Sequence, residues 1–247
     1  MKILAICGSP RKGNTYSVLN TIKENYPGID FKIIELRKLN FQFCKGCYSC
    51  VKKGEDKCPI KDDRELIIKE MLEADGLMLA SPVYSHMVSA TMKNFFDRFG
   101  FYAHRPRFFD KYAMSLVTCS GYGAEEAMKY MDKMLSVFGF NLVPPVDLHF
   151  RAGKTPEMMK LQNREKAFAA FDKFLSRIEK GGRDKPPLDM LVPFRIFKYV
   201  SEIDRENMPA DYEYYKDKTE YYYDIKIPYY KKFITKRVVD KIVAGFN

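Results

Sequence analysis

The sequence lacks the long apolar run that a membrane-spanning helix requires. Although 46% of its 247 residues are hydrophobic, no stretch approaches the ~20 consecutive apolar residues of such a helix. The N-terminus enters an apolar segment directly, without the layout of a signal peptide. We therefore expect a cytoplasmic protein with no integral membrane segment, and a chain of this length can bury a sizeable core.

The sequence also lacks the usual signatures of nucleic-acid binding. It has no basic block, no zinc-finger spacing and no aromatic RNA-recognition motif. The formal net charge of +10 is concentrated in residues 1–183 and favours small anionic ligands there. Internal repeats and low-complexity tracts are absent as well. We therefore expect an ordinary globular protein that does not bind nucleic acid.

Five apolar segments alternate with segments of helical periodicity. The predicted strands cover residues 3–7, 31–36, 76–81, 113–118 and 142–148. The predicted helices cover residues 14–26, 62–74, 88–99, 123–138 and 156–179. This alternation predicts an α/β fold, with a doubly wound, five-stranded parallel sheet. A polar loop after the first strand indicates the order 2-1-3-4-5, in which the carboxyl ends of strands 1 and 3 flank a crevice.

The segment from Gly8 to Thr15 connects the first predicted strand to the first predicted helix. It has neither the Walker A spacing nor a Gly-x-Gly-x-x-Gly motif, so both common nucleotide motifs are excluded. Backbone N–H groups at a helix N-terminus attract anions, and this loop adds hydroxyl, amide and guanidinium groups. These groups belong to Ser9, Arg11, Asn14 and Thr15. The loop predicts a phosphate site, with a capped turn that binds nothing as the alternative.

Two further polar loops follow strands that border the same crevice. The first contains Ser81, Pro82, Val83, Tyr84 and Ser85. The second contains Thr118, Cys119, Ser120, Gly121, Tyr122 and Gly123. Glycines permit close approach of the backbone, and two tyrosines supply aromatic surface. Together with the phosphate loop, they favour a ligand with a flat ring over plain strand-to-helix turns.

Four of the six cysteines form the pattern Cys44-x2-Cys47-x2-Cys50-x7-Cys58-Pro59. Thiolates at two-residue intervals on an irregular loop can converge on one soft metal centre, and iron–sulfur clusters use this spacing. The pattern is compatible with a [4Fe–4S] cluster, with zinc, or with reduced or disulfide-bonded cysteines that hold no metal.

The remaining candidate residues are isolated. Cys7 and Cys119 end apolar runs and are expected to be buried as small hydrophobic residues. Asp62 and Asp63 are interpreted as the acidic start of a helix, where carboxylates stabilise the dipole. The three histidines are too scattered to predict a triad or a metal site. They are His86, His104 and His149.

The composition changes after the glycine- and proline-rich segment 181–187. Residues 184–247 hold more than half of the 17 tyrosines and two segments with helical patterning, 188–200 and 230–244. Such an aromatic tail is expected to be ordered. It would wrap the core, contact a second subunit or lie on a membrane surface. We therefore expect a domain at 1–183 that carries the cysteine loop 44–58, and an extension at 184–247.

These motifs, in this order, resemble the NADPH-dependent FMN reductase-like family of flavodoxin-fold proteins, specifically its iron–sulfur flavoprotein branch. The resemblance also rests on Met92-Lys93-x-Phe95-x-Asp97-Arg98 and covers about residues 1–180. It implies that the FMN phosphate is held by Ser9, Arg11, Asn14 and Thr15. It implies that the isoalloxazine is bordered on one side by Pro82, Val83, Tyr84 and Ser85. On another side it would be bordered by Thr118, Ser120, Gly121, Tyr122 and Gly123.

The resemblance also implies an activity. NAD(P)H would give a hydride to FMN, and the electrons would pass to a small acceptor such as a quinone, a flavin or a redox protein. They would pass directly or through a [4Fe–4S] cluster at Cys44, Cys47, Cys50 and Cys58. No side chain need act covalently, so no catalytic residue is predicted. The alternatives are a flavodoxin-type electron carrier without turnover and a cluster-free NAD(P)H:FMN or quinone reductase.

The arrangement along the chain further predicts an oligomer. The cysteine segment follows strand 2 on the edge of the sheet that carries the FMN crevice, so both centres should lie on one face. Tyrosines of the tail suit a subunit contact because they combine a large apolar area with a polar tip. We expect a homodimer or homotetramer in which each cluster serves the flavin of its own or a neighbouring subunit.

Overall fold

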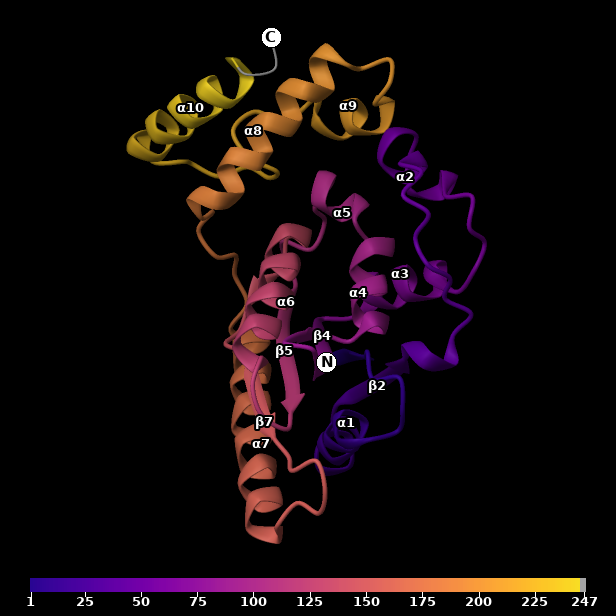
Figure 1. Ribbon diagram of the computed structural model, residues 1–247. Coiled ribbons are helices and arrows are strands. Elements are labelled where there is room, and N and C mark those ends of the chain that lie inside the picture. The colour runs from indigo at the N-terminus through magenta and orange to yellow at the C-terminus, as the bar shows by residue number, and fades with distance from the viewer. Residues whose placement is uncertain (245–247) are drawn as a thin grey trace. The chain divides into compact units, whose positions relative to one another are not determined.

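The computed structural model describes residues 1–244 and divides the chain into two compact units. The first unit comprises Met1–Lys45, Lys61–Gly100 and Arg107–Arg183. The second comprises Gly46–Ile60, Phe101–Pro106 and Asp184–Asn247. The last three residues of the predicted extension, 245–247, lie outside the described residues. The colours in Figure 1 follow the chain through both units.

The first unit is built on a parallel sheet of order β2-β1-β3-β5-β6, with β7 also paired to β5. The short β4 pairs with β3 in the antiparallel sense. The strands are β1 (Lys2–Cys7), β2 (Asp30–Glu35), β3 (Gly76–Tyr84), β4 (Met87–Val88), β5 (Tyr112–Cys119), β6 (Asn141–Leu142) and β7 (Val146–His149). The predicted α/β class and flavodoxin-like strand order are confirmed.

The fifth predicted strand is divided in two. Residues 142–148 were expected as one edge strand, but they contribute to both β6 and β7. Pro144 and Pro145 lie between these two short strands and have no N–H to donate to a sheet. The three central strands are continuous by contrast, because their nearly unbroken apolar runs are buried on both faces.

Helices cover both faces of the sheet in the first unit. They are α1 (Asn14–Asn25), α3 (Arg64–Glu73), α4 (Ala90–Arg98), α6 (Ala124–Phe138) and α7 (Glu157–Lys180). The 3₁₀ turn η1 (Leu36–Lys38) follows β2. Leu19 and Ile22 of α1 and Phe171 of α7 belong to one apolar cluster with residues of the sheet. Phe96 of α4 instead meets Tyr130 and Phe138 of α6.

The second unit is mostly helical and has an aromatic core. Its helices are α2 (Ser49–Lys52), α5 (Phe101–His104), α8 (Leu188–Ile203), α9 (Pro209–Tyr215) and α10 (Tyr229–Ala244), and η2 (Glu55–Lys57) is a 3₁₀ turn. The ring of Phe194 contacts those of Tyr215, Tyr221 and Tyr222. The tail is therefore ordered, as its composition predicts. No helix within residues 1–244 is long and apolar enough to cross a membrane.

A buried arginine ties the cysteine segment to the rest of the second unit. Arg105 donates hydrogen bonds to the carbonyl oxygens of Cys50 and Val51, at 2.6 and 2.9 Å. Its guanidinium also forms an ion pair with the buried Asp211 of α9. His104 Nδ1 lies 2.8 Å from the second oxygen of the same carboxylate. Residues far apart in the sequence thus share one polar network.

A second buried arginine fixes the chain that leads into the cysteine segment. The Asp62 and Arg98 side chains form a two-bond ion pair with exposed fractions of only 0% and 1%. Asp62 also accepts the N–H of Gln42 at 2.9 Å, and Arg98 donates to the Gln42 carbonyl at 2.8 Å. Asn94 of α4 accepts the N–H of Cys44 at 3.3 Å.

The acidic pair before α3 therefore does more than its sequence position indicates. Asp62 and Asp63 precede the helix as expected, but the carboxylate of Asp63 accepts the N–H of Asn40 at 2.8 Å. The interpretation as a helix start is confirmed, since Asp63 is the N-cap of α3 and Asp62 accepts the N–H of Arg64 at 3.2 Å. In addition, both carboxylates hold residues 40–42.

Replacing Arg98 by Met should lower the free energy of unfolding by about 3–5 kcal/mol, because the Asp62 carboxylate would stay buried without its partner. The Asp62→Asn/Arg98→Met double variant should recover part of this loss. Urea denaturation followed by circular dichroism would measure both. Lys93 on the same helix offers a matched control, since its ion pair with Asp97 is half exposed. Lys93→Met should cost less than about 1 kcal/mol, and equal losses in the two variants would contradict the expected role of Arg98.

The same ion pair should make stability depend on acid. Burial tends to raise the pKa of Asp62, but Arg98 and the N–H groups of Gln42 and Arg64 hold it below its usual value. The stabilisation is then present above the unfolded-state pKa of about 3.9 and is lost as the pH falls through the lower folded pKa. Urea titrations from pH 6 to pH 3 should show a shallower loss in Asp62→Asn than in the parent chain. An equal loss of stability in acid in Asp62→Asn and in the parent chain would contradict this role of Asp62.

Candidate functional site

Three loops at the carboxyl edge of the sheet enclose a small polar cleft of about 80 Å³. It is lined by Ser9, Arg11, Gly13, Asn14, Thr15, Pro82, Val83, Tyr84, Thr118, Cys119, Ser120 and Phe150. Most of the residues predicted to touch FMN therefore meet here, whereas Ser85, Gly121, Tyr122 and Gly123 do not line the cleft. Its volume is far below the ~300–1,000 Å³ of a pocket that encloses a whole ligand. It suits the phosphate end of a ligand.

The first loop reaches the sheet through a close backbone contact. A Cβ on Gly8 would lie 2.7 Å from that of Met92, so only glycine fits there. The hydroxyl of Ser9 donates to the Arg11 carbonyl at 2.7 Å and shapes the turn. Gly13 is the N-cap of α1 and provides no side chain to bond the first N–H groups of the helix. These N–H groups, together with the exposed Arg11, favour an anion.

Hydroxyl groups connect the three loops to one another. The side chains of Thr15 and Thr118, both buried, lie 2.7 Å apart and join the first loop to the third. Ser89 caps α4 and donates to the Gly8 carbonyl at 2.5 Å. The N–H of Ser89 donates to the hydroxyl of Ser81 at 3.1 Å. Ser89 thereby joins the second loop to the first. Ser89 was not singled out from the sequence, where only its N-cap position before α4 could have indicated it.

The second loop ends in a tight hairpin between β3 and β4. Ser85 and His86 form its two-residue turn and both have positive φ, 48° and 63°. Residues other than glycine rarely adopt this backbone conformation, so the turn holds local strain. The third loop packs directly on it, because a Cβ on Gly123 would lie 2.5 Å from the Cα of His86. Gly123 therefore sets the distance between these two loops.

Two tyrosines leave aromatic surface exposed at the ends of the loops. Tyr84 follows Pro82 and Val83 and is 42% exposed. Tyr122 lies in the third loop and is 87% exposed. The ring of Tyr84 lines the phosphate-sized cleft and provides surface on which a flat ring can stack, whereas Tyr122 is not part of the lining.

A thiol on the wall of the cleft belongs to a chain of hydrogen bonds. Cys119 Sγ lies 3.3 Å from His149 Nδ1, and His149 Nε2 lies 2.8 Å from Asp147 Oδ2. The other carboxylate oxygen of Asp147 accepts from Lys166 at 2.7 Å. Burial raises the pKa of the Cys119 thiol, which favours its protonated form. These distances fit a thiol that donates to Nδ1 of a histidine protonated on Nε2.

This chain corrects the interpretation of two residues. Cys119 is buried as expected, but it also lines the cleft and is not only an apolar filler. His149 was interpreted as isolated, yet it lies opposite Cys119 in the register of β5 and β7. Asn163 of α7 fixes it by bonding both its main-chain N–H and its carbonyl. The pairing of the two strand ends is the signal that could have found it.

The cysteine pattern spans the boundary between the two units. Cys44 lies in the first unit, and Cys47, Cys50 and Cys58 lie in the second. Cys44 and Cys47 are exposed, and Cys58 is buried. Within residues 1–244, no group of three or more His, Cys, Asp or Glu side chains is arranged to hold a metal ion.

The donor chemistry of the segment nonetheless fits an iron–sulfur cluster. Gly46, Tyr48 and Gly54 have positive φ, so the backbone is an irregular loop rather than a continuous helix or strand. On such a backbone, thiolates at two-residue spacing can turn toward one centre. The lysines of the segment would offset the negative charge of a thiolate-bound cluster. They are Lys45, Lys52, Lys53 and Lys57.

Comparison with known proteins agrees with this geometry. A family model described as NADPH-dependent FMN reductase matches residues 1–154. An iron–sulfur flavoprotein from Archaeoglobus fulgidus is 33% identical over 224 residues, covering 88% of this chain and 99% of the relative. An iron–sulfur flavoprotein from Methanocaldococcus jannaschii is 47% identical over 103 residues, covering 40% of this chain and 51% of the relative.

The structure of an NAD(P)H:quinone oxidoreductase from Methanothermobacter marburgensis is similar in fold, with a TM-score of 0.57 and 18% identity. The similarity covers 72% of this chain and 96% of the Methanothermobacter chain. The match to the Archaeoglobus protein covers more of the chain than residues 1–183 can supply, so the similarity extends into the tail and beyond the range expected from the motifs. The chain therefore belongs to the NADPH-dependent FMN reductase family, within its iron–sulfur flavoprotein branch.

Proposed function

We propose that the chain binds FMN noncovalently at the three loops and oxidises NAD(P)H with it. The observation that carries this proposal is the phosphate-sized cleft at the start of α1, with the exposed ring of Tyr84 in its lining. FMN, when bound, accepts a hydride and can release electrons one at a time. The protein has to bind the cofactor, orient its ring and leave one face open to the nicotinamide.

Each loop has a distinct part in this binding. The first N–H groups of α1 and the guanidinium of Arg11 would hold the phosphate, with Asn14 beside them. Ser9 would act by shaping the loop, because its hydroxyl is already bonded to the Arg11 carbonyl. Thr15 and Thr118 would hold the first and third loops at the spacing that the phosphate needs.

The isoalloxazine ring would lie outside the small cleft, against the ends of the second and third loops. Pro82, Val83, Tyr84 and Ser85 would border it on one side. Thr118, Ser120, Gly121, Tyr122 and Gly123 would border it on another. The exposure of Tyr84 and Tyr122 leaves room for a nicotinamide or a small acceptor such as a quinone. No side chain is assigned a covalent step, so catalysis would rest on binding and orientation.

Cys44, Cys47, Cys50 and Cys58 would hold a [4Fe–4S] cluster. Such a cluster would accept single electrons and pass them to a redox partner. The chain itself would position the thiolates, through Arg98 and Asp62 at residues 40–44 and through Arg105 at Cys50 and Val51.

A homo-oligomer is part of the proposal. Helix α10 exposes a row of large apolar side chains: Tyr229, Tyr230, Phe233, Ile234, Val238 and Ile242. An exposed aromatic and aliphatic surface of this kind suits a subunit contact. Sizing chromatography of the parent chain and of Phe233→Glu tests this contact. The parent should elute as an oligomer and the variant as a smaller particle.

The alternative function is an electron carrier without turnover. Steady-state oxidation of NADH and NADPH separates the two, with quinone, nitroaromatic and flavin acceptors tested in turn. Sustained turnover with at least one acceptor supports the oxidoreductase. Bound flavin with negligible turnover for every acceptor would favour the carrier.

Replacing Arg11 by Glu should weaken FMN binding at least about tenfold, because a charge-assisted bond to the phosphate is lost and repulsion is added. Fluorescence titration of flavin-free protein with FMN measures this. Riboflavin, which has no phosphate, should bind the variant and the parent equally. Lys12→Glu is the matched control, because Lys12 lies over the ring of Tyr16 and does not line the cleft. A loss of riboflavin affinity as large as that of FMN would contradict a phosphate role for Arg11.

Replacing Cys47 by Ser should remove most of the iron and leave FMN bound, because the thiolate set loses one ligand while the FMN cleft is unchanged. Anaerobic purification followed by iron, zinc and FMN quantitation measures both. The expected parent value is about four irons per FMN. Ser49→Ala, in the same segment, should retain its iron. Iron content that is unaffected by Cys47→Ser would exclude this cysteine as a ligand.

A further inference from the structure

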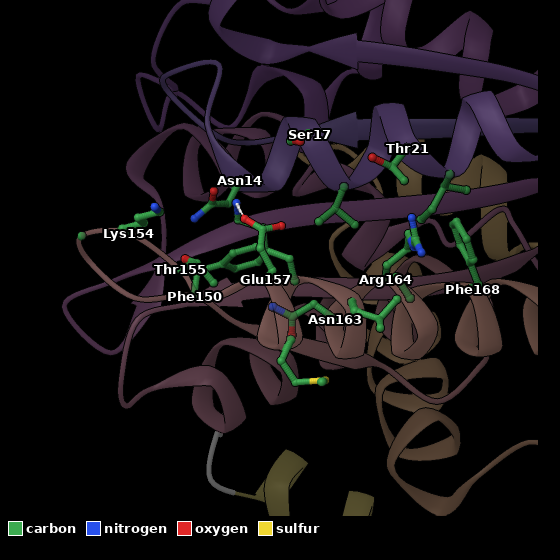
Figure 2. A pocket seen from close by; sticks show the side chains of 17 residues that line it. Asn14, Ser17, Thr21, Phe150, Lys154, Thr155, Glu157, Asn163, Arg164 and Phe168 are labelled. Atoms are coloured by element: carbon green, nitrogen blue, oxygen red, sulfur yellow. Dashed lines mark hydrogen bonds and ion pairs between the residues drawn. The ribbon is translucent and has the colours of Figure 1, made fainter.

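A second and much larger groove lies between α1 and the N-terminal part of α7 (Figure 2). Its volume is about 890 Å³, within the range of pockets that enclose a ligand. Residues 150–155 close one end of it. It is lined by Asn14, Ser17, Val18, Thr21, Ile22, Phe150, Gly153, Lys154, Thr155, Glu157, Met158, Lys160, Leu161, Asn163, Arg164, Ala167 and Phe168.

The floor of the groove is apolar and firmly supported. Ile22 and Ala167 are buried members of the core cluster. Val18, Phe150 and Phe168 pack against that cluster and remain partly exposed. The floor is therefore an apolar surface with one aromatic ring near each end, as Figure 2 shows, and a flat ring can stack on either.

The rim of the groove is basic. Lys154 and Arg164 are exposed, and within residues 1–244 neither makes an ion pair with a carboxylate. Lys160 is paired with Glu157, the one acidic residue of the lining, at 2.7 Å. On the opposite side, Ser17 and Thr21 of α1 contribute hydroxyl groups, as Figure 2 shows. The groove therefore combines a flat apolar floor, an excess of positive charge and hydroxyl donors.

The groove adjoins the phosphate cleft. Asn14 and Phe150 line both cavities. From Asn14 to Ile22 the groove follows α1 for roughly 12 Å, at the helical rise per residue. A ligand whose phosphate lies at the first turn of α1 can extend into the groove without leaving the surface of the protein.

We propose that this groove binds an adenosine phosphate group, the half of a dinucleotide that flavin mononucleotide lacks. Phe168 would stack on the purine, and Arg164, which lies beside it in Figure 2, would bind the phosphate of the adenosine half. Lys154, at the end shared with the cleft, would bind the next phosphate of a dinucleotide, and the hydroxyls of Ser17 and Thr21 would bond the ribose or the base. Two dinucleotides carry this group, FAD and NAD(P)H. The groove shares only Asn14 and Phe150 with the cleft of the proposed FMN site, and it binds without contributing to a reaction step.

The direct test is a titration of the full-length protein with AMP. Isothermal titration calorimetry would measure the binding, once with FMN present and once without it. Arg164→Glu should weaken AMP binding about tenfold or more, because an attractive charge becomes a repulsive one. Ser17→Trp should block the groove from the side of α1. Lys173→Glu is the matched control, since Lys173 is exposed on the same helix and does not line the groove. It should bind AMP as the parent does.

Two further measurements identify the source of the adenosine phosphate. If the groove holds that half of FAD, flavin-free protein should bind FAD more tightly than FMN, and Arg164→Glu should abolish the difference. If it holds that half of NAD(P)H, AMP should compete with NADPH, and Arg164→Glu should raise the KM for NADPH more than it lowers kcat. Either pattern supports the proposal.

AMP binding that is absent, or equal in the parent, Arg164→Glu and Ser17→Trp, would overturn the proposal. The AMP titration requires no flavin, so its outcome is separate from that of the Arg11→Glu experiment. AMP binding in a protein that fails to bind FMN would leave the groove as an independent nucleotide site. FMN binding without AMP binding would overturn the proposal for the groove and leave the proposed FMN site unaffected.

Discussion

Parallel hydrogen bonding between β1, β3 and β5 is the constraint on which the rest of the first unit depends. It places Cys7 beside Ala80 and Pro82 beside Thr118, so all three strands end at the same edge. The loops that follow must then meet, whatever their sequences. Short polar contacts, such as the pair of Thr15 and Thr118, adjust the spacing between the loops within this frame. The frame is apolar and rigid, which leaves the loop residues to be chosen for ligand binding.

A buried guanidinium holds the backbone just before the cysteine segment in the first unit, and another holds the backbone within it in the second unit. Arg98 bonds the backbone at Gln42, and Arg105 bonds the backbone at Cys50 and Val51. Each guanidinium is in turn held by a buried aspartate, Asp62 or Asp211. The planar fork of arginine suits this use, because it can satisfy a carboxylate and backbone carbonyls together. An irregular segment thereby acquires fixed backbone positions without forming regular structure of its own.

Local patterns made most of the first unit predictable. Apolar runs, helical periodicity and the polar loops between them depend on neighbouring residues, and strand order follows from a general rule of parallel sheets. Contacts between distant residues could not be read in the same way. Asp62 with Arg98, and Cys119 with His149, are adjacent only because of tertiary pairing. The groove between α1 and α7 depends on how two helices diverge, and the seven-residue α9 is too short to show a period.

The second unit is assembled from three pieces of chain that are far apart in the sequence. During synthesis, the segment with Cys47, Cys50 and Cys58 leaves the ribosome long before Asp211 and the tyrosines that surround Phe194 exist. At synthesis rates of roughly 5–20 residues per second, about 8–30 s pass between the synthesis of Cys58 and that of Asp211, which completes the network with Arg105. In that interval Arg105 lacks the buried carboxylate that pairs with it in the folded unit. The order of translation thus makes the backbone around Cys50 and Val51 one of the last parts of this unit to be fixed.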